Sequence, residues 1–226
     1  MTTSTSPDRA GHLRGPVGLT AERCIRRLQK GYRGDRPAAV STLARLRRGA
    51  GRPAHAVPDL WGLTGTDELA EAMAELPEDS RDHIDHVRAE EALHLVLTLW
   101  ALHQQSHRDA DMHVAGRGLG RAVRMLMNPR GAAAESGKGD SEPDEPVRRR
   151  FVRAGTATTL EVLAVRLRDI VLLLRREDIA LDYGLLADQL YRWQLPVARA
   201  DVRRSWGRDF HLAGVVRDRS DEPGGE

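Results

Sequence analysis

Arginine is the residue type whose spacing in this sequence most clearly indicates a chemistry. Of the 35 lysine and arginine residues, only Lys30 and Lys138 are lysines. A guanidinium can donate to a phosphate through two nitrogens at once, whereas an ammonium acts as a point charge. GC-rich codons also raise the arginine content of a protein for no structural reason. The positions of the arginines, and not their number, must therefore indicate whether they bind an anion. Arginine clusters without acidic neighbours favour an anionic partner, because close like charges repel each other.

Two dense runs and one glycine-rich stretch meet this condition. The runs are Arg45, Arg47, Arg48 and Arg52, at a helix end and the loop after it, and Arg148, Arg149, Arg150 and Arg153. In the stretch Gly116–Arg121, backbone N–H groups and a helix N-terminus lie close to two arginines, which predicts a seat for a phosphate. We expect these clusters to converge on one face of the folded chain. Aromatic residues make up only 4%, too few for a base-stacking platform, so we expect the phosphate backbone to be held without sequence reading.

Histidines offer the main alternative chemistry. His103 and His107 are four residues apart in an expected helix, and Asp109, Asp111 and His113 follow them. Such a group could bind a metal, but the sequence has no HExxH motif and no second element supplies a third ligand at a fixed spacing. The sequence also has no GxSxG elbow, no P-loop and no dinucleotide-binding fingerprint. We therefore expect no enzyme activity, no metal site and no cofactor.

Charge is unevenly distributed along a chain whose net charge is only +2. Residues 21–52 carry ten basic and two acidic side chains, and residues 147–220 carry fifteen basic and nine acidic side chains. Residues 59–91, in contrast, carry two basic and eleven acidic side chains. Basic segments attract phosphate, and each phosphate that they neutralise releases counterions. The acidic segment could shield the basic ones, face a basic partner subunit, or be a solvated surface.

Other sequence features predict a cytoplasmic protein. Cys24 is the single cysteine, so no internal disulfide can form, which suits a reducing compartment. The first sixteen residues have no apolar run of signal-peptide length. The longest apolar stretch, residues 170–174, is too short to span a membrane. Tryptophans 61, 100, 193 and 206 are expected in the core or at an interface.

The elements that must position these residues are all predicted to be helices, because no segment alternates between apolar and polar residues as a strand does. We expect an all-α, two-part helical bundle. Its predicted divisions are a disordered tail at 1–18, an N-terminal bundle of about five helices at 19–127, a flexible acidic and glycine-rich linker at 128–146, a C-terminal bundle of three to four helices at 147–214, and a disordered tail at 215–226.

Helix starts are predicted from capping residues. The first helix is expected over 21–32, and Ser80 is expected to cap a long helix that ends near Gln105. The sequence Thr158-x-x-Glu161 predicts a capping box before a helix with one apolar face. Asp182 is expected to cap the next helix, which ends at Trp193, and the last helix is expected over 198–212.

Taken in order, several motifs resemble the CasB family, the small subunit of the type I-E CRISPR surveillance complex Cascade. The motifs are Ala44-Arg-Leu-Arg-Arg48, Leu119-Gly-Arg121, Arg149-Arg-Phe151, Leu167-x-x-Ile-Val-x-Leu-Leu174, Ile179-Ala-Leu-Asp-Tyr183, Leu190-x-x-Trp193 and Trp206-Gly-Arg-Asp-Phe210. The resemblance covers about residues 21–213, and its strongest part is the C-terminal half. The long N-terminal tail and the insert at 128–146 depart from the family pattern.

The resemblance implies a non-catalytic subunit that acts in antiviral defence. It implies two copies in the complex, beside the Cascade backbone and large subunits and the CRISPR guide RNA. The subunit would steady the heteroduplex of guide RNA and target DNA, together with the displaced non-target strand, in the R-loop. An R-loop exchanges one duplex for another at nearly equal free energy, so modest contacts to the backbone can stabilise it.

The resemblance also implies which arginines contact nucleic acid. The basic positions that match the family pattern are Arg47, Arg48, Arg121, Arg149, Arg150 and Arg168. Four neighbours extend this set: Arg45, Arg52, Arg117 and Arg124. Arg168 lies near the apolar side of its helix, so pairing with an acid is an alternative for it.

Two other functions remain open at this point. Residues 182–204, with Pro196 in the turn, could form a helix-turn-helix of a sequence-specific DNA-binding transcription regulator, which would select one operator over random duplex. The histidine group would suit a metal-dependent hydrolase, and such a protein would hold a nearly stoichiometric ion.

Overall fold

The computed structural model describes residues 14–75, 77–78, 84–127 and 145–218. The all-helical prediction is confirmed: over these residues the chain forms helices, and its only β pairing is an isolated bridge between His113 and Leu181. No helix in these ranges combines the length and the apolar character that crossing a membrane requires. Most of the predicted linker, residues 128–144, lies outside the described residues, so the division into domains remains a prediction.

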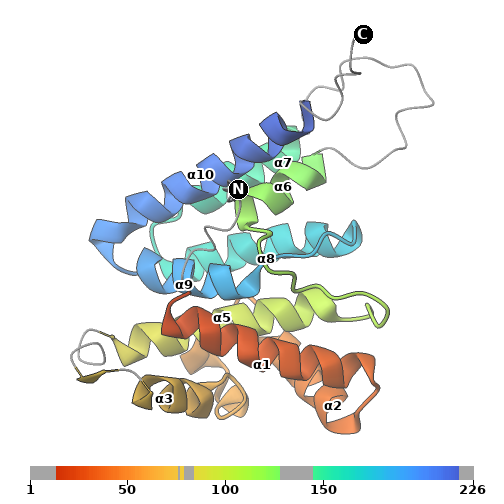
Figure 1. The fold of residues 1–226 in the computed structure, drawn as a ribbon, viewed down its shortest axis with the longest axis vertical. Helices are drawn as coiled ribbons and strands as arrows, with labels where there is room; N and C mark the ends of the chain where they lie inside the picture. The colour runs from red at the N-terminus through yellow and green to blue at the C-terminus, as the bar shows by residue number, and fades with distance from the viewer. Residues whose placement is uncertain (1–13, 76, 79–83, 128–144, 219–226) are drawn as a thin grey trace, which may run out of the picture.

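Nine α-helices and three short 3₁₀ helices make up the described part of the chain (Figure 1). The α-helices are α1 (Pro16–Arg33), α2 (Pro37–Leu46), α3 (Thr66–Ala74), α5 (His86–Gln104), α6 (Leu119–Met127), α7 (Glu145–Gly155), α8 (Leu160–Arg176), α9 (Tyr183–Trp193) and α10 (Pro196–Asp218). The 3₁₀ helices are η2 (Arg47–Gly49), η3 (Ala54–Ala56) and η4 (Pro58–Leu60).

Helix α5 is the centre of the fold. Every residue from Ala92 to Gln104 is buried, as expected for a helix that is apolar on all sides. It packs against α1 and α2 on one side and against α8 and α9 on the other, and Figure 1 shows it across the middle of the molecule. One apolar core therefore joins residues from before and after the predicted linker.

Helices α6, α7, α8 and α10 pack together as a second group. Helix α6 precedes the linker in the sequence, yet its main neighbour is α10. The two helices touch at Gly120, where a Cβ would lie 2.1 Å from the carbonyl oxygen of Trp206. In Figure 1 these two helices lie in front of α7. Only a glycine permits this approach, so the residue fixes the partner of α6.

Several helix starts differ from the predicted ones. Asp182 caps α9 as predicted, because its side chain accepts from the backbone N–H of Leu185. Thr159, and not Thr158, caps α8, and Asp85 caps α5; Ser80 lies outside the described residues. Helix α1 begins at Pro16, inside the predicted tail at 1–18, since proline suits the first helical position. At the other end, the backbone of α10 continues to Asp218, past the predicted end at 212.

Candidate nucleic-acid interface

The first predicted arginine run lies at the end of α2 and in the turn that follows. All four of its guanidinium side chains, those of Arg45, Arg47, Arg48 and Arg52, are exposed. Two of them donate to backbone carbonyls: Arg45 Nη2 to Asp59 O at 2.6 Å and Arg52 Nη2 to Ala56 O at 2.8 Å. A carbonyl orients a guanidinium without neutralising its charge. Within the described residues no ion pair to a carboxylate involves this run, so it keeps its full positive charge.

Helix α5 holds this turn in place. The Nε2 atom of His94 lies 3.1 Å from the carbonyl oxygen of Arg52. Because a carbonyl only accepts, Nε2 must carry the proton, and burial lowers the pKa of His94 so that the ring stays neutral. Gly49 is buried where a Cβ would lie 2.9 Å from Thr98 Cγ2. The turn is thus fixed to the core while its arginines point to solvent.

Arg168 of α8 adjoins the same turn. Gly51 has a φ of +81°, and a Cβ there would lie 2.9 Å from Cδ of Arg168, so the arginine stem rests on the glycine backbone. The Arg168 side chain is exposed, and none of the ion pairs among the described residues includes it. The alternative in which Arg168 pairs with an acid therefore has no support there. The structure thereby places Arg168 beside Gly51 and the turn that carries Arg52, although these residues are far apart in the sequence.

The exposed side of α8 continues from Arg168 to Arg166, which we call the α8 face. Buried residues such as Leu163, Leu167 and Val171 occupy the opposite side of the helix. On one edge of the face, Arg168 meets the turn after α2, and Glu161 lies near enough to His55 for the imidazole to affect its pKa. On the other edge, Arg166 donates to the carbonyl of Arg153 on α7. The face is therefore bordered by basic residues of two other elements.

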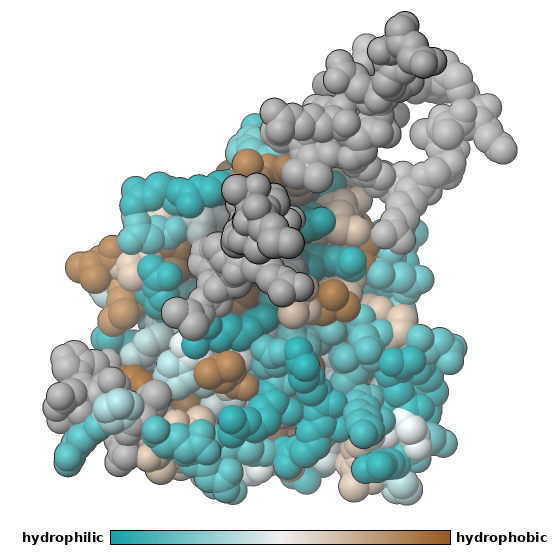
Figure 2. All heavy atoms as spheres, viewed as in Figure 1, coloured by the Kyte–Doolittle hydropathy of each residue, from teal (hydrophilic) through white to brown (hydrophobic). Residues whose placement is uncertain are grey.

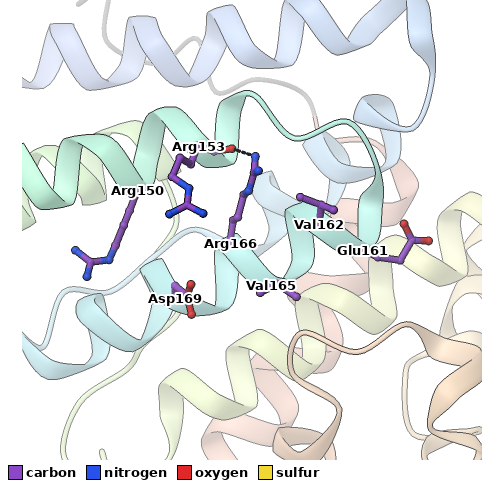
Figure 3. Close-up of a pocket in the computed structure, with 7 residues that line it drawn as sticks. All are labelled: Arg150, Arg153, Glu161, Val162, Val165, Arg166 and Asp169. Carbon is purple, nitrogen blue, oxygen red and sulfur yellow. Dashed lines mark hydrogen bonds between the residues drawn. The ribbon is translucent and has the colours of Figure 1, made fainter.

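Helix α7 supplies the second predicted run. The Arg150 Nη1 atom donates to the carbonyl of Pro146 at 3.3 Å, and Arg149 lies 3.8 Å from the carboxylate of Glu145. Figure 3 shows Arg150 and Arg153 projecting from α7 toward α8, where Arg166 points back at them. The predicted site residues included neither Arg153 nor Arg166. The three-residue spacing from Arg150 to Arg153 indicates a shared helix side, but nothing in the sequence indicates that Arg166 would join them.

The predicted phosphate seat at Gly116–Arg121 is wrong, because carboxylates of this chain already occupy it. Asp209 of α10 accepts from the backbone N–H of Arg121 at 2.9 Å. Asp182 accepts from the backbone N–H of Gly116 at 2.7 Å. The N–H groups of Gly116, Gly120 and Arg121 are therefore already bonded to carboxylates of this chain. Burial raises the pKa of Asp209, although these backbone bonds favour its charged form.

The three predicted arginines of this stretch lie apart from the α8 face. Arg124 is half-buried, with its guanidinium 5.5 Å from the centre of the Phe210 ring, which in turn stacks on Phe151. Arg117 is also half-buried, and its carbonyl accepts from Asp182 N at 2.7 Å. Arg121 is exposed. Helix α6 packs mainly against α10, so these three arginines are not among the basic residues that border the α8 face, and the expected convergence of the two arginine runs on one face stays a prediction.

The histidines of the metal alternative take separate partners. His103 is buried with its Nδ1 atom 2.9 Å from the Tyr183 hydroxyl, whereas His107 lies 3.1 Å from the carboxylate of Asp178. Over the residues that the structure describes, no group of three or more histidine, cysteine or acidic side chains is arranged to hold a metal.

Cys24 is buried, which raises the pKa of its thiol to about 12.

Exposed apolar residues are few on the surface drawn in Figure 2. That side of the molecule is mostly hydrophilic, and its hydrophobic residues form separate spots. Three of the four tryptophans are buried as expected, but Trp61 is 70% exposed, in the loop after η4. It is therefore no part of the core.

Comparisons with known proteins agree on one family. The sequence model of CRISPR-associated protein Cse2 matches residues 42–211. The structure is similar to that of CasB from Thermobifida fusca, with a TM-score of 0.72 and 47% sequence identity over 88% of this chain and 99% of that chain. A chain of a CRISPR RNA-guided surveillance complex has a TM-score of 0.60 at 22% identity, covering 91% of this chain and 99% of that chain. CasB of M. ruber has a TM-score of 0.56 at 20% identity, over 92% and 98%. A comparison with curated proteins gave no match.

Proposed function

The chain belongs to the family of CRISPR-associated protein Cse2, to which CasB also belongs, and on that premise we propose that it is the non-catalytic small subunit of a type I-E Cascade complex. In that complex it stabilises the R-loop through contacts between arginines and phosphates. Its partners are the Cascade backbone and large subunits, the guide RNA, the two DNA strands and a second copy of itself. It acts in the cytoplasm, where these nucleic acids are found.

The observation that carries the proposal is a group of arginines around the α8 face that make no ion pair within the described residues. Arg168 lies against Gly51, the neighbour of Arg52, at one edge, and Arg150 lies toward the other. Their bonds within the described residues go to backbone carbonyls or are absent, so each guanidinium keeps donors for a phosphate. Some other exposed arginines differ, because Arg27 pairs with Glu68 and Arg108 with Asp35.

Contacts of this kind favour nucleic acid of any sequence. Phosphate contacts fix where a protein sits on a nucleic acid but carry no sequence information. An R-loop needs only a small added stabilisation, because the duplex formed is about as stable as the duplex replaced. The likeness to a chain of a CRISPR RNA-guided surveillance complex supports the proposed setting at the level of the fold.

The test compares R-loop lifetimes in the Cascade complex reconstituted with guide RNA and this chain. The triple variant Arg48→Ala, Arg52→Ala and Arg168→Ala should shorten the lifetime about tenfold, since three exposed charged contacts of roughly 0.5 kcal/mol each are lost. Lifetimes would be measured by release of a labelled target DNA after a challenge with competitor DNA. The mass of each assembly would verify that the variant is incorporated.

The control is a triple variant of arginines that already pair with carboxylates: Arg27→Ala, Arg108→Ala and Arg204→Ala. It removes the same formal charge and should leave the lifetime within about twofold of wild type. Equal lifetimes for wild type and the Arg48, Arg52 and Arg168 triple variant would refute the proposal. An effect confined to one target sequence, with matched guides, would instead favour a sequence-specific regulator.

A further inference from the structure

A hollow between α7 and α8 combines charge and apolar surface. Its volume is about 410 Å³, and the residues that line it are Arg150, Arg153, Glu161, Val162, Val165, Arg166 and Asp169. Figure 3 shows the arginines of α7 reaching across toward α8, with the two valines along the α8 side. A volume of several hundred cubic ångströms lies in the range of small-molecule binding sites.

The positive charge in this hollow is not cancelled by its acidic residues. Arg150 and Arg166 donate to backbone carbonyls, and within the described residues no ion pair joins Arg150, Arg153 or Arg166 to Asp169. Glu161 is engaged elsewhere: the hydroxyl of Thr159 donates to it, which lowers the pKa of the Glu161 carboxyl. Its side chain points away from the three arginines in Figure 3. An anion could therefore bind all three guanidinium groups.

The floor of the hollow is apolar, although it is exposed. Val162 is 38% exposed and Val165 is 51% exposed, on a helix whose core-facing side is already filled by other residues. Valine is a weaker helix former than alanine or leucine, so helix propensity does not explain why valine occupies these two exposed positions. An apolar surface beside three cations suits a ligand that has both an anionic group and a flat apolar body.

We propose that this hollow binds one unpaired nucleotide of the displaced DNA strand, with its base on Val162 and Val165 and its phosphate held by Arg150, Arg153 and Arg166. Guanidinium planes also stack on bases, so the arginines can contact both parts of the nucleotide. Asp169 can accept from an amino group of the base. A paired base cannot enter such a site, and therefore the hollow selects single strand over duplex.

This inference rests on the proposed function, which supplies the displaced strand, but it makes a separate prediction. If the protein binds only the phosphates, its affinity for the strand does not depend on whether the strand carries bases. A nucleotide site requires the base. An abasic displaced strand keeps every phosphate and lacks the bases. Compared with a base-bearing strand that is mismatched to the target, so that neither can re-pair, it separates the two.

The experiment measures R-loop lifetimes in the reconstituted complex with a displaced strand that either carries bases mismatched to the target strand or is abasic, so that neither strand can re-pair with the target. With the wild-type chain, the abasic strand should shorten the lifetime about fivefold, as expected for the loss of one partly buried apolar contact. With Val162→Gln and Val165→Gln combined, base-bearing and abasic strands should give equal lifetimes. Glutamine is a good helix former, so these exposed substitutions keep α8 intact.

Val152→Gln is the matched control. Val152 is 52% exposed on α7 and does not line the hollow, so this variant should still distinguish the two strands about fivefold. If wild type gives equal lifetimes with both strands, the nucleotide site is refuted, while the arginine variants still test the proposed function. If the valine variant keeps the wild-type difference, the bases are contacted elsewhere and the assignment to this hollow fails.

Discussion

The partners of each arginine separate the arginines that could bind phosphate from those that hold the fold together. Arg14 donates twice to Asp182, at 2.8 and 2.7 Å, and also pairs with Glu22. Asp182 is 2% exposed and further accepts from Gly116 and Leu185. A buried carboxylate with four donors keeps its charge, and these bonds hold the pKa of Asp182 below its usual value against the opposing effect of burial. Arg48 and Arg168 are exposed and have no such partner in the described residues.

Buried histidines make the stability of the protein depend on pH. Burial lowers the pKa of His103 to about 3, whereas an unfolded histidine titrates near 6.5. Between these values the unfolded chain binds a proton that the folded chain does not, so stability falls as pH decreases below about 6.5. His103 alone should cost about 2 kcal/mol of unfolding free energy between pH 7 and pH 5.

The variant His103→Gln should remove that part of the pH dependence. Urea unfolding measures the free energy of unfolding at pH 7 and at pH 5, and the change between the two pH values is compared for variant and wild type. The lost bond to Tyr183 lowers the variant's stability equally at both pH values, so it cancels in this comparison. His86→Gln, at an exposed position, should leave the wild-type dependence unchanged. A pH dependence as steep in His103→Gln as in wild type would show that His103 becomes protonated in the folded state.

At the scale of elements, the contact of α6 with α10 depends on one glycine. A methyl group at Gly120 would lie 2.1 Å from Trp206 O and 2.6 Å from Phe210 N. Because the obstacle is backbone, the two helices would have to separate. Gly120→Ala should therefore lower the free energy of unfolding by about 2–4 kcal/mol, as measured by urea denaturation.

Gly207 offers the opposite case on α10. A Cβ there would meet nothing within 4 Å, so Gly207→Ala should raise the stability by up to about 1 kcal/mol through its better helix propensity. Destabilisation by Gly207→Ala equal to that of Gly120→Ala would show that any substitution harms these helices, and the close approach at Gly120 would lose its explanation.

The sequence predicts where the helices lie along the chain better than it predicts which residues contact each other across the fold. The apolar spacing over 160–174 matches α8, and Asp182 is the cap of α9 as expected. Local patterns decide both features. The bond from Arg121 N to Asp209 joins residues 88 apart, so no local pattern indicates that this carboxylate fills the predicted phosphate seat. The Gly116–Arg121 stretch, which the sequence predicts to bind an external phosphate, therefore binds a carboxylate of the chain itself.

Part of the candidate site can likewise be predicted from the sequence, and part depends on packing between helices. The two dense runs, Arg45–Arg52 and Arg148–Arg153, are visible in the sequence because their members are close along the chain. The meeting of Arg168 with Gly51, and of Arg166 with the carbonyl of Arg153, arises from packing between helices. Charge counts along the chain do not reveal which arginines are neutralised, since Arg27 finds Glu68 only after folding.

For the whole molecule, one apolar core joins helices from both ends of the chain. This core fixes the turn after α2, α7 and α8 relative to one another, so the basic groups of the α8 face keep a set spacing. Preorganised charges bind with less loss of conformational entropy than mobile ones.

The most direct test of this account is the salt dependence of target-DNA binding by the reconstituted complex. Each neutralised phosphate contributes about 0.9 to the slope of log K against log salt concentration. The variant Arg48→Ala, Arg52→Ala and Arg168→Ala should make that slope shallower by about 2–3, whereas the Arg27, Arg108 and Arg204 triple variant should leave it at the wild-type value. An unchanged slope for the first variant would contradict the claim that these arginines bind phosphate.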